Sequence, residues 1–288
     1  MYTHTPVLLD EVLTYLDPQP GGRFIDVTLG AAGHTRAILE RASPDGRVLA
    51  IDQDETSLAQ ARATLESFGS RAILVHANFR NVAGIAQENN FMEADGILAD
   101  IGISSMMIDD PSRGFSFMHE GPLDMRMDRR QELSASDIVN TYREKEIADI
   151  LYEYGEERRS RAIARSIVHA RPLKLTTDLV YAVTRVMGAP RYGRIHPATR
   201  TFQGLRIFVN DELGSLEAFL DQSMTVVRSG GRLVVITFHS LEDRIVKNKF
   251  RSSPHGKALT KKVVTAGDEE IRRNPRARSA KLRAWEKN

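Results

Sequence analysis

Polar side chains follow each of four short apolar segments in the first hundred residues. They are Asp26, Asp52, Asn78 and Asp100. A single acid after a strand ordinarily caps a helix or forms a turn. Because the carboxyl ends of parallel strands meet at one edge of a sheet, four such residues in succession favour a ligand-binding crevice at that edge.

The loop after the first apolar segment has the sequence Gly30-Ala31-Ala32-Gly33 and leads into a helical pattern. Glycines let the backbone approach a ligand closely, and an acid at the end of the next strand, here Asp52, can accept the hydroxyls of a ribose. The loop lacks the G-x-G-x-x-G spacing that places a pyrophosphate on a helix N-terminus. A ligand with a ribose but no pyrophosphate therefore fits better, and S-adenosylmethionine is the common one. A nicotinamide-dependent dehydrogenase is the alternative with the same sheet, and the missing third glycine counts against it.

The segment from Asp100 to Ser105 lies where transferases of this architecture place the reacting group. An exocyclic amine of a base needs an acceptor during methylation, because its lone pair is delocalised into the ring. Asp100 could be this acceptor. The usual tetrapeptide of such enzymes, Asp or Asn followed by two prolines and an aromatic residue, is absent, so Asp100 could equally bind the methionine part of the cofactor. The ring of Phe79 could face an adenine or fill the core.

The chain has no cysteine, which excludes disulfides, thiolate metal sites and covalent attack of a thiolate on the C5 carbon of a pyrimidine. A nitrogen or oxygen atom remains as the methyl acceptor. His34, His196 and His239 are widely spaced and no spacing supports zinc, so we expect capping or packing roles for them. No signal-peptide pattern and no apolar run of membrane-spanning length is present, so a cytoplasmic location without a membrane partner is expected.

Strand and helix signals alternate through the first hundred residues and predict a doubly wound α/β sheet. Through the middle of the chain no segment resembles a buried parallel strand. The alternation resumes with a helix over 202–227 and a strand over 233–238. We therefore predict a discontinuous cofactor-binding domain, formed by residues 1–108 and 201–288. Residues 109–200 are predicted to be an inserted helical domain that recognises RNA or another substrate.

The 288 residues carry a formal net charge of only +2, but this charge is unevenly distributed. Residues 247–288 contain thirteen Lys or Arg and four Asp or Glu, a net charge of +9, which leaves −7 on the rest of the chain. A basic tail suits a polyanion, and the alternative is a solvated, partly disordered end. Trp285 is expected to pack the last segment down. We favour contact with nucleic acid because a second basic cluster exists, made of Arg158, Arg159, Arg161, Arg165, Arg171 and Lys174.

Seven long and unusual sequence blocks span nearly the whole chain. They are HTPVLLDE (4–11), RGFSFM (113–118), GPLDMRMD (121–128), YGEER (154–158), HPATRTFQ (196–203), FHSLEDRIVK (238–247) and NPRARSAKLR (274–283). These blocks resemble the bacterial 16S ribosomal RNA cytosine-N4 methyltransferases (RsmH or MraW type). The resemblance implies a class I (Rossmann-like) methyltransferase fold with an inserted helical domain. It also implies methylation of the N4 amine of one cytosine in 16S ribosomal RNA near the ribosomal P site.

The resemblance further implies which positions hold S-adenosylmethionine. They are Ala32, Gly33, His34, Asp52, Phe79, Asp100 and Met107, with Asp100 also the candidate catalytic residue. Met107 stands where the family has a glutamine, whose amide hydrogen bonds a thioether cannot replace. The implied partner is 16S ribosomal RNA or the small ribosomal subunit. A homodimer is among the oligomeric states that the sequence allows.

Arg126, Arg200 and Arg244 belong to these blocks and are our candidate RNA contacts, because guanidinium groups hold phosphates and position a substrate. Structural ion pairs would account for each of them equally well. The target cytosine must leave its stack or lie in an open strand for its amine to face the methyl donor. A non-catalytic ribosome-assembly factor is the remaining alternative, since it would keep the basic surfaces without methyl transfer.

Overall fold

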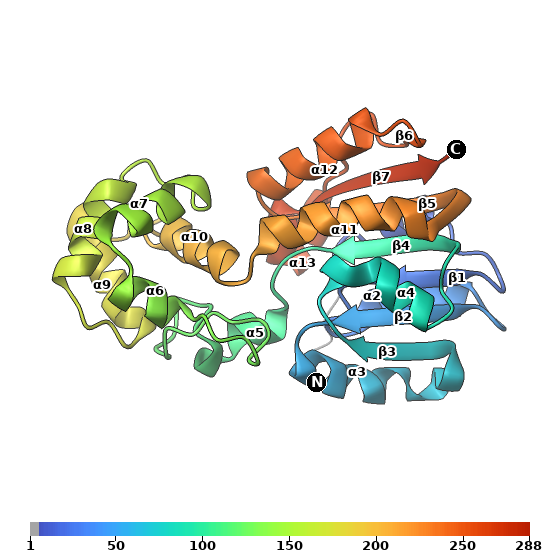
Figure 1. Cartoon of the computed structure of the whole chain (residues 1–288), viewed down its shortest axis with the longest axis horizontal. Coiled ribbons are helices and arrows are strands. Elements are labelled where there is room, and N and C mark those ends of the chain that lie inside the picture. Colours follow the sequence, from blue (N-terminus) through green and yellow to red (C-terminus); the bar gives the residue numbers. More distant parts are fainter. Residues whose placement is uncertain (1–5) are drawn as a thin grey trace. The chain divides into compact units, whose positions relative to one another are not determined.

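The computed structural model describes residues 6–288 and divides into two compact units (Figure 1). The first unit contains the chain up to Gly102 together with Leu213–Asn288, and the second contains Ile103–Glu212. His4 and Thr5, which begin the first sequence block, lie outside the described residues. Within residues 6–288 no helix is both long enough and apolar enough to cross a membrane.

A seven-stranded sheet forms the centre of the first unit, which we name the sheet unit. The strand order is β3-β2-β1-β4-β5-β7-β6. β1 to β5 run parallel to one another, and β7 runs antiparallel between β5 and β6. The predicted doubly wound α/β sheet is therefore confirmed, with an antiparallel edge added by the tail. The strands are β1 (Arg23–Asp26), β2 (Arg47–Asp52), β3 (Ala72–His76), β4 (Ala94–Asp100), β5 (Val227–Thr237), β6 (Gly256–Ala258) and β7 (Lys281–Lys287).

Helices cover both faces of this sheet because alternate strand residues point to opposite sides. In β1, Phe24 packs into one buried cluster and Ile25 into the other, and Val48 and Leu49 of β2 alternate in the same way. Both faces are thus apolar, as a parallel sheet covered on both sides requires. The helices of this unit are α1 (Leu9–Leu16), α2 (Gly33–Arg41), α3 (Glu55–Leu65), α4 (Val82–Glu88), α11 (Glu212–Val226, apart from its first residue), α12 (Ser240–Ser252) and α13 (Asp268–Arg273).

The second unit consists of helices and loops, and we name it the helical unit. Its core is a single buried cluster that includes Phe115, Leu151, Ile163, Leu179 and Phe202. These side chains come from the loop after α5 and from α7 to α10, so one apolar centre holds the unit together. The helices are α5 (Ser105–Asp109), α6 (Ala135–Thr141), α7 (Glu144–Glu153), α8 (Ser160–His169), α9 (Thr176–Met187) and α10 (Thr199–Val209).

The boundaries of the helical unit differ from those expected. We predicted residues 109–200, whereas the structure places Ile103–Glu212 in this unit. The predicted helix over 202–227 is two helices, α10 and α11, which separate where Asp211 has a positive φ of 45°. Phe202, Leu205 and Val209 of α10 belong to the helical core. The boundary therefore follows α10, because apolar spacing alone does not reveal which core a helix packs against.

The basic tail is an integral part of the sheet unit. β7 lies between β5 and β6, and the fully buried Trp285 stacks on Phe250 with 6.3 Å between ring centroids. Arg283 donates to Asp243 at 2.7 Å. The solvated, partly disordered end considered above is therefore wrong for this segment, because its apolar positions fill the core. The expectation that Trp285 packs the last segment down is confirmed.

Candidate functional site

Three acids lie at the carboxyl ends of neighbouring strands in the sheet unit. Asp52 ends β2, Asp26 ends β1 and Asp100 ends β4, and these strands are adjacent in that order. Phe79 follows β3, the neighbour of β2. After β1 the chain continues to β2 and β3 on one side of β1, and it then crosses to β4 on the other side of β1. The carboxyl ends of β1 and β4 are therefore a topological switch point. Ligands of doubly wound sheets bind outside the carboxyl ends of the strands at such a point.

The glycine loop depends on contacts outside itself. The backbone N–H of Gly30 donates to Oδ2 of Asp52 at 2.8 Å. Ala32 has a positive φ of 65° and is the N-cap of α2. A Cβ atom on Gly33 would lie only 2.3 Å from Cγ of Pro6, whereas one on Gly30 would find its nearest neighbour at 3.9 Å. Gly33 is therefore the position where packing demands a glycine.

Both oxygens of the Asp52 carboxylate accept backbone hydrogen bonds. Oδ2 accepts from Gly30 at 2.8 Å and Oδ1 accepts from Asp54 at 2.9 Å. Burial raises the pKa of Asp52 to about 6, and these two hydrogen bonds oppose that rise. Each carboxylate oxygen has a second lone pair. The ribose-binding role predicted for Asp52 is therefore compatible with its role in holding the loop.

Asp26 holds the elements of the site together. Its Oδ2 accepts from the hydroxyl of Thr35 at 2.6 Å, and its Oδ1 accepts from the backbone of Thr28 at 3.1 Å. Burial raises the pKa of Asp26. The hydroxyl of Thr28 in turn accepts the backbone N–H of Asp100 at 2.6 Å. Sequence analysis missed Thr28 and Thr35, since a hydroxyl residue near a strand-end acid is too common a signal.

His34 and Asp100 bring unpartnered polar atoms together where α2 begins and β4 ends. Nε2 of His34 lies 3.6 Å from Oδ2 of Asp100, which is longer than a hydrogen bond. Among the described residues, neither ring nitrogen of His34 nor Oδ1 of Asp100 has a hydrogen-bond partner, although these atoms are buried. Such atoms are unfavourable unless a ligand or water satisfies them. They mark this end of the sheet as the candidate ligand site.

Two of the predicted cofactor positions have other contacts. Phe79 packs edge-on against Phe219, with ring centroids 5.5 Å apart and planes at 80°. Phe79 is half-buried, so this packing does not enclose the residue completely. Met107 belongs to the helical unit, where its side chain is buried in the core. The assignment of Met107 to the cofactor site stays a prediction.

The comparisons with known proteins are decisive for the family. The model of the MraW methylase family matches residues 1–288. This chain belongs to the MraW methylase family. Curated relatives of this chain are named ribosomal RNA small subunit methyltransferase H. The one from a Nostoc species is 52% identical and covers 100% of this chain and 93% of its own length. The one from Thermomicrobium roseum is 50% identical, and the match covers 99% of this chain and 94% of that relative. The one from Dehalococcoides mccartyi is 48% identical, and the match covers 99% of this chain and 87% of that relative.

A solved structure also resembles this chain. That of PH0851 has a TM-score of 0.50 and 14% sequence identity, and the match covers 97% of this chain and 45% of that one. A similarity at this level concerns the fold alone. The strand order and the family together confirm the predicted class I methyltransferase fold.

His239 and His196 have the capping and packing roles expected for them. Nδ1 of His239 accepts the backbone N–H of Glu242 at 3.4 Å at the start of α12. The buried carboxylate of Glu242 in turn accepts the backbone N–H of Phe238 at 2.8 Å. His196 stacks on Phe117 in the helical unit, with 4.5 Å between ring centroids. Glu242, which sequence analysis did not single out, therefore fixes the turn that follows β5.

The candidate RNA contacts differ in how their guanidinium groups are used. Arg126 binds Asp124 through two hydrogen bonds, from Nε at 2.7 Å and from Nη2 at 2.9 Å, and also donates to a backbone carbonyl. The structure thus favours the ion-pair alternative for Arg126. Arg200 is exposed and donates to one backbone carbonyl at 3.3 Å. Arg244 is exposed on α12.

The predicted basic cluster is partly used within the helical unit. Arg171 donates to the backbone carbonyls of Val139 and Tyr142. Nε of Arg165 lies 3.5 Å from a carboxylate oxygen of Glu144. The cluster therefore contains structural residues as well as cations that face water, the latter being Arg158, Arg161 and Lys174.

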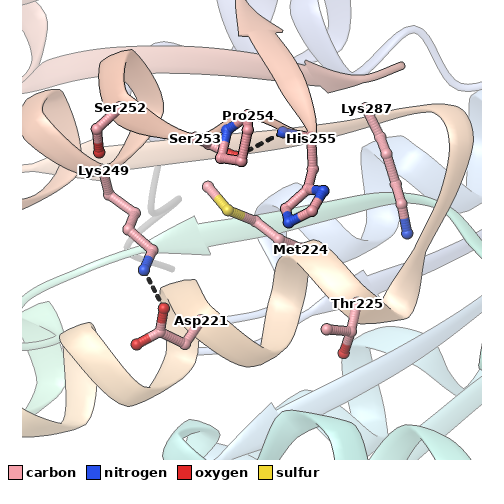
Figure 2. Close-up of a pocket in the computed structure, with 9 residues that line it drawn as sticks. All are labelled: Asp221, Met224, Thr225, Lys249, Ser252, Ser253, Pro254, His255 and Lys287. Carbon is pink, nitrogen blue, oxygen red and sulfur yellow. Dashed lines mark hydrogen bonds and ion pairs between the residues drawn. The ribbon is translucent and has the colours of Figure 1, made fainter.

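A cavity of about 540 Å³ lies in the sheet unit, away from the carboxyl ends of the parallel strands (Figure 2). It is lined by the last turns of α11 and α12 and by the end of β7, next to the amino ends of the parallel strands. Figure 2 shows Lys249 extended toward Asp221, with which it forms an ion pair. Nζ of Lys287 donates to the carbonyl of Val227 at 2.7 Å. Both lysines thus have partners in the wall, and this cavity is separate from the candidate ligand site.

Proposed function

We propose that this protein transfers the methyl group of S-adenosylmethionine to the N4 amine of a specific cytosine in 16S ribosomal RNA, near the ribosomal P site. Membership of a methylase family supports methyl transfer, and relatives named ribosomal RNA small subunit methyltransferase H support the RNA substrate. The observation that carries the proposal is the group of buried, unpartnered polar atoms on His34 and Asp100 at the switch point of the sheet.

The residues of the candidate site fit S-adenosylmethionine in charge and hydrogen-bonding type. Oδ1 of Asp100 is an unpartnered acceptor among the described residues, and it suits the ammonium group of the methionine part. The imidazole of His34 can donate to the carboxylate of that part. Asp52 would hold the ribose hydroxyls, and the ring of Phe79 would face the adenine. When bound, the cofactor supplies a methyl group made electrophilic by its sulfonium centre.

The chain must orient the cytosine amine and accept its proton. The amine becomes nucleophilic when an acceptor polarises its N–H, because the lone pair is otherwise delocalised into the ring. As the bond from N4 to the methyl carbon forms, the bond from that carbon to sulfur breaks and N4 loses a proton. The carboxylate of Asp100 would receive this proton. If Asp100 holds only the ammonium group, backbone carbonyls in the following segment accept the hydrogen bond that orients the amine, and the released proton passes to water.

The setting of the reaction follows from its substrate. The protein would act in the cytoplasm on 16S ribosomal RNA or on the small ribosomal subunit, and the target cytosine must be unstacked to reach the site. The absence of cysteine excludes activation of the pyrimidine through C5, which supports a nitrogen target. The cytoplasmic location and a homodimer stay predictions.

The decisive experiment identifies the methylated nucleoside. The full chain is incubated with S-adenosylmethionine that carries a labelled methyl group and with 16S RNA from cells that lack this protein. Mass mapping should find N4-methylcytidine at one position near the P site. Asp100→Ala should lower kcat/KM by about 100-fold or more, the usual effect of losing one group that stabilises a transition state. Label on another base, or no label with wild type, contradicts the proposal.

Matched variants separate the two roles considered for Asp100. Asp45→Ala removes an exposed acid elsewhere in the sheet unit and should leave kcat/KM within about twofold of wild type. If Asp100 is the proton acceptor, Asp100→Asn lowers kcat at saturating cofactor. If Asp100 only holds the ammonium group, Asp100→Asn raises KM for S-adenosylmethionine and leaves kcat close to wild type.

A further inference from the structure

The helical unit exposes aromatic and basic side chains together around the C-terminal end of α9. Five of the six large apolar side chains that the described residues leave exposed lie in this unit, and Tyr192 is the most exposed of them. Single exposed apolar residues are common. The surroundings of Tyr192 are unusual, however, since the 32 residues 179–210 contain five arginines and no Asp or Glu.

Tyr192 stands at the tip of a closed turn. The backbone N–H of Arg194 donates to the carbonyl of Arg191 at 3.1 Å. Gly193 has a positive φ of 70°, as the third residue of a type II turn requires. Every residue from 188 to 195 is exposed. The turn therefore presents the ring of Tyr192 to solvent with an arginine on either side in the sequence.

Further arginines lie at the end of α9, close to this turn. Cζ of Arg185 lies 6.0 Å from the centre of the Tyr181 ring, and Nη1 of Arg159 donates to the carbonyl of Val186 at 3.0 Å. α9 ends at Met187, and the four residues from there to the turn span at most about 14 Å. We name these residues the arginine–tyrosine surface: Arg159, Tyr181, Arg185, Arg191, Tyr192 and Arg194.

We propose that the arginine–tyrosine surface binds a single-stranded segment of the RNA substrate. The ring of Tyr192 stacks on an unpaired base, and the arginines neutralise the adjoining phosphates. Exposed aromatic rings among cations are the means by which proteins hold single-stranded nucleic acid, since every base offers a face for stacking. The absence of acids over residues 179–210 makes the segment complementary to a polyanion. This inference rests on the proposed RNA substrate and concerns how that substrate is held.

The test compares Tyr192→Ala, Tyr192→Phe and Tyr152→Ala in the full chain. Tyr152 is also exposed, but it lies on α7 between Leu151 and Glu153 instead of between arginines. Affinity for fluorescently labelled 16S RNA is measured by fluorescence anisotropy at several salt concentrations, and affinity for S-adenosylmethionine by calorimetry. Tyr192→Ala should raise the Kd for RNA about tenfold, which is the loss of one stacked base. Tyr192→Phe and Tyr152→Ala should stay within about twofold of wild type, because the first keeps the ring and the second lies off the surface.

A charge variant tests the arginines separately. The double variant Arg191→Gln/Arg194→Gln should weaken RNA binding and lower the slope of log affinity against log salt by about 1 to 2, one counterion for each lost phosphate contact. An unchanged slope together with an unchanged Kd overturns the role of the turn. Affinity for S-adenosylmethionine should be the same in all these variants, and far-ultraviolet circular dichroism should match wild type because the turn is exposed.

The remaining outcomes separate this inference from the proposed function. The inference is overturned if Tyr192→Ala binds RNA as tightly as wild type. It is also overturned if Tyr192→Phe loses as much RNA affinity as Tyr192→Ala, since stacking needs no hydroxyl. Weaker binding to intact small subunits without weaker binding to purified 16S RNA would mean that the surface docks a protein, which also overturns it. The proposed function fails on a different result, when wild type forms no N4-methylcytidine. A lower RNA affinity of Tyr192→Ala supports the inference even then.

Discussion

Gly33 and Pro6 approach each other so closely that a Cβ atom on Gly33 would lie 2.3 Å from Cγ of Pro6. Gly33 is the first residue of α2, and its neighbours Ala32 and His34 are candidate cofactor positions. Pro6 comes from the first of the seven sequence blocks, HTPVLLDE (4–11). The packing of Pro6 against the glycine loop therefore leaves no room for a side chain at position 33.

Gly33→Ala is expected to lower the free energy of unfolding by about 1–3 kcal/mol, the usual result of inserting a methyl group into a packed site. It should also weaken binding of S-adenosylmethionine, because the loop must shift. In the Pro6→Ala background, Gly33→Ala should cost much less stability than it costs in wild type, since alanine at position 6 has no Cγ. The double variant Pro6→Ala/Gly33→Ala should therefore be nearly as stable as Pro6→Ala alone. Urea denaturation followed by circular dichroism measures both effects. A Gly33→Ala protein as stable as wild type would show that Pro6 moves aside freely.

Binding of S-adenosylmethionine should weaken below pH 6. Burial raises the pKa of Asp52 to about 6, and the ionised carboxylate is the better acceptor for ribose hydroxyls. Affinity should fall about tenfold for each pH unit below 6 and level off above 7, since binding then requires the loss of one proton. Calorimetry across this range measures the slope, and Asp52→Ala should flatten it. A slope that persists in Asp52→Ala assigns the titration to another group.

Without bound cofactor, the titration of Asp52 should make the protein less stable as the pH rises, whereas the same rise in pH strengthens cofactor binding. Its pKa in the folded chain is raised from an ordinary value of 3.8, so the folded state favours the protonated form. The contribution of this group to stability is therefore present below pH 3.8 and is lost as the pH rises through 6. Bound cofactor should offset that loss by binding only the folded state.

Asn210→Ala should destabilise the protein through the helical unit. Oδ1 of Asn210 accepts the backbone N–H of Met127 at 2.7 Å, and Nδ2 donates to the carbonyl of Met125 at 2.8 Å. Both partners lose their hydrogen bonds in the buried interior, which should lower the free energy of unfolding by about 2–4 kcal/mol. Asn89→Ala is the control, because the side chain of Asn89, the C-cap residue of α4, donates a single bond to the carbonyl of Ile85 one turn back. Chemical denaturation should show a loss of about 0.5 kcal/mol or less for the control.

Trp285→Ala should unfold the tail and the sheet unit together. Trp285 is fully buried in β7, so its truncation should lower the free energy of unfolding by about 3–5 kcal/mol. Arg278→Ala changes an exposed residue of the same tail and should stay within about 0.5 kcal/mol of wild type. Thermal denaturation of both variants checks this. Equal melting temperatures would mean that the tail is a detachable segment.

Local sequence patterns predicted the parallel part of the sheet and most of the candidate ligand site at its carboxyl ends. Apolar runs that end in acids located β1, β2 and β4, because strand length and strand ends are encoded within a few residues. The break at Asp211 was not predictable from the same kind of pattern. Apolar spacing continues across Asn210 and Asp211, and only packing against two different cores separates α10 from α11.

The charged residues show the limit of such patterns most clearly. Arg126 was a candidate RNA contact and Arg283 lies in the basic tail, yet each is bound to an aspartate within its own unit. Net charge counts cations without regard to which of them have acidic neighbours in the fold. Asp243, for example, is 40 residues from Arg283 in the chain.

By itself the sequence determined the family, the succession of the first five strands along the chain and the acids that end three of them, because these are properties of contiguous residues. Only the tertiary structure decided which of those acids has free acceptors. Asp26 is satisfied by Thr28 and Thr35, whereas His34 and Asp100 keep buried polar atoms without a partner among the described residues. The physical reason is that hydrogen-bond satisfaction depends on distances between residues far apart in the chain, and folding alone sets those distances.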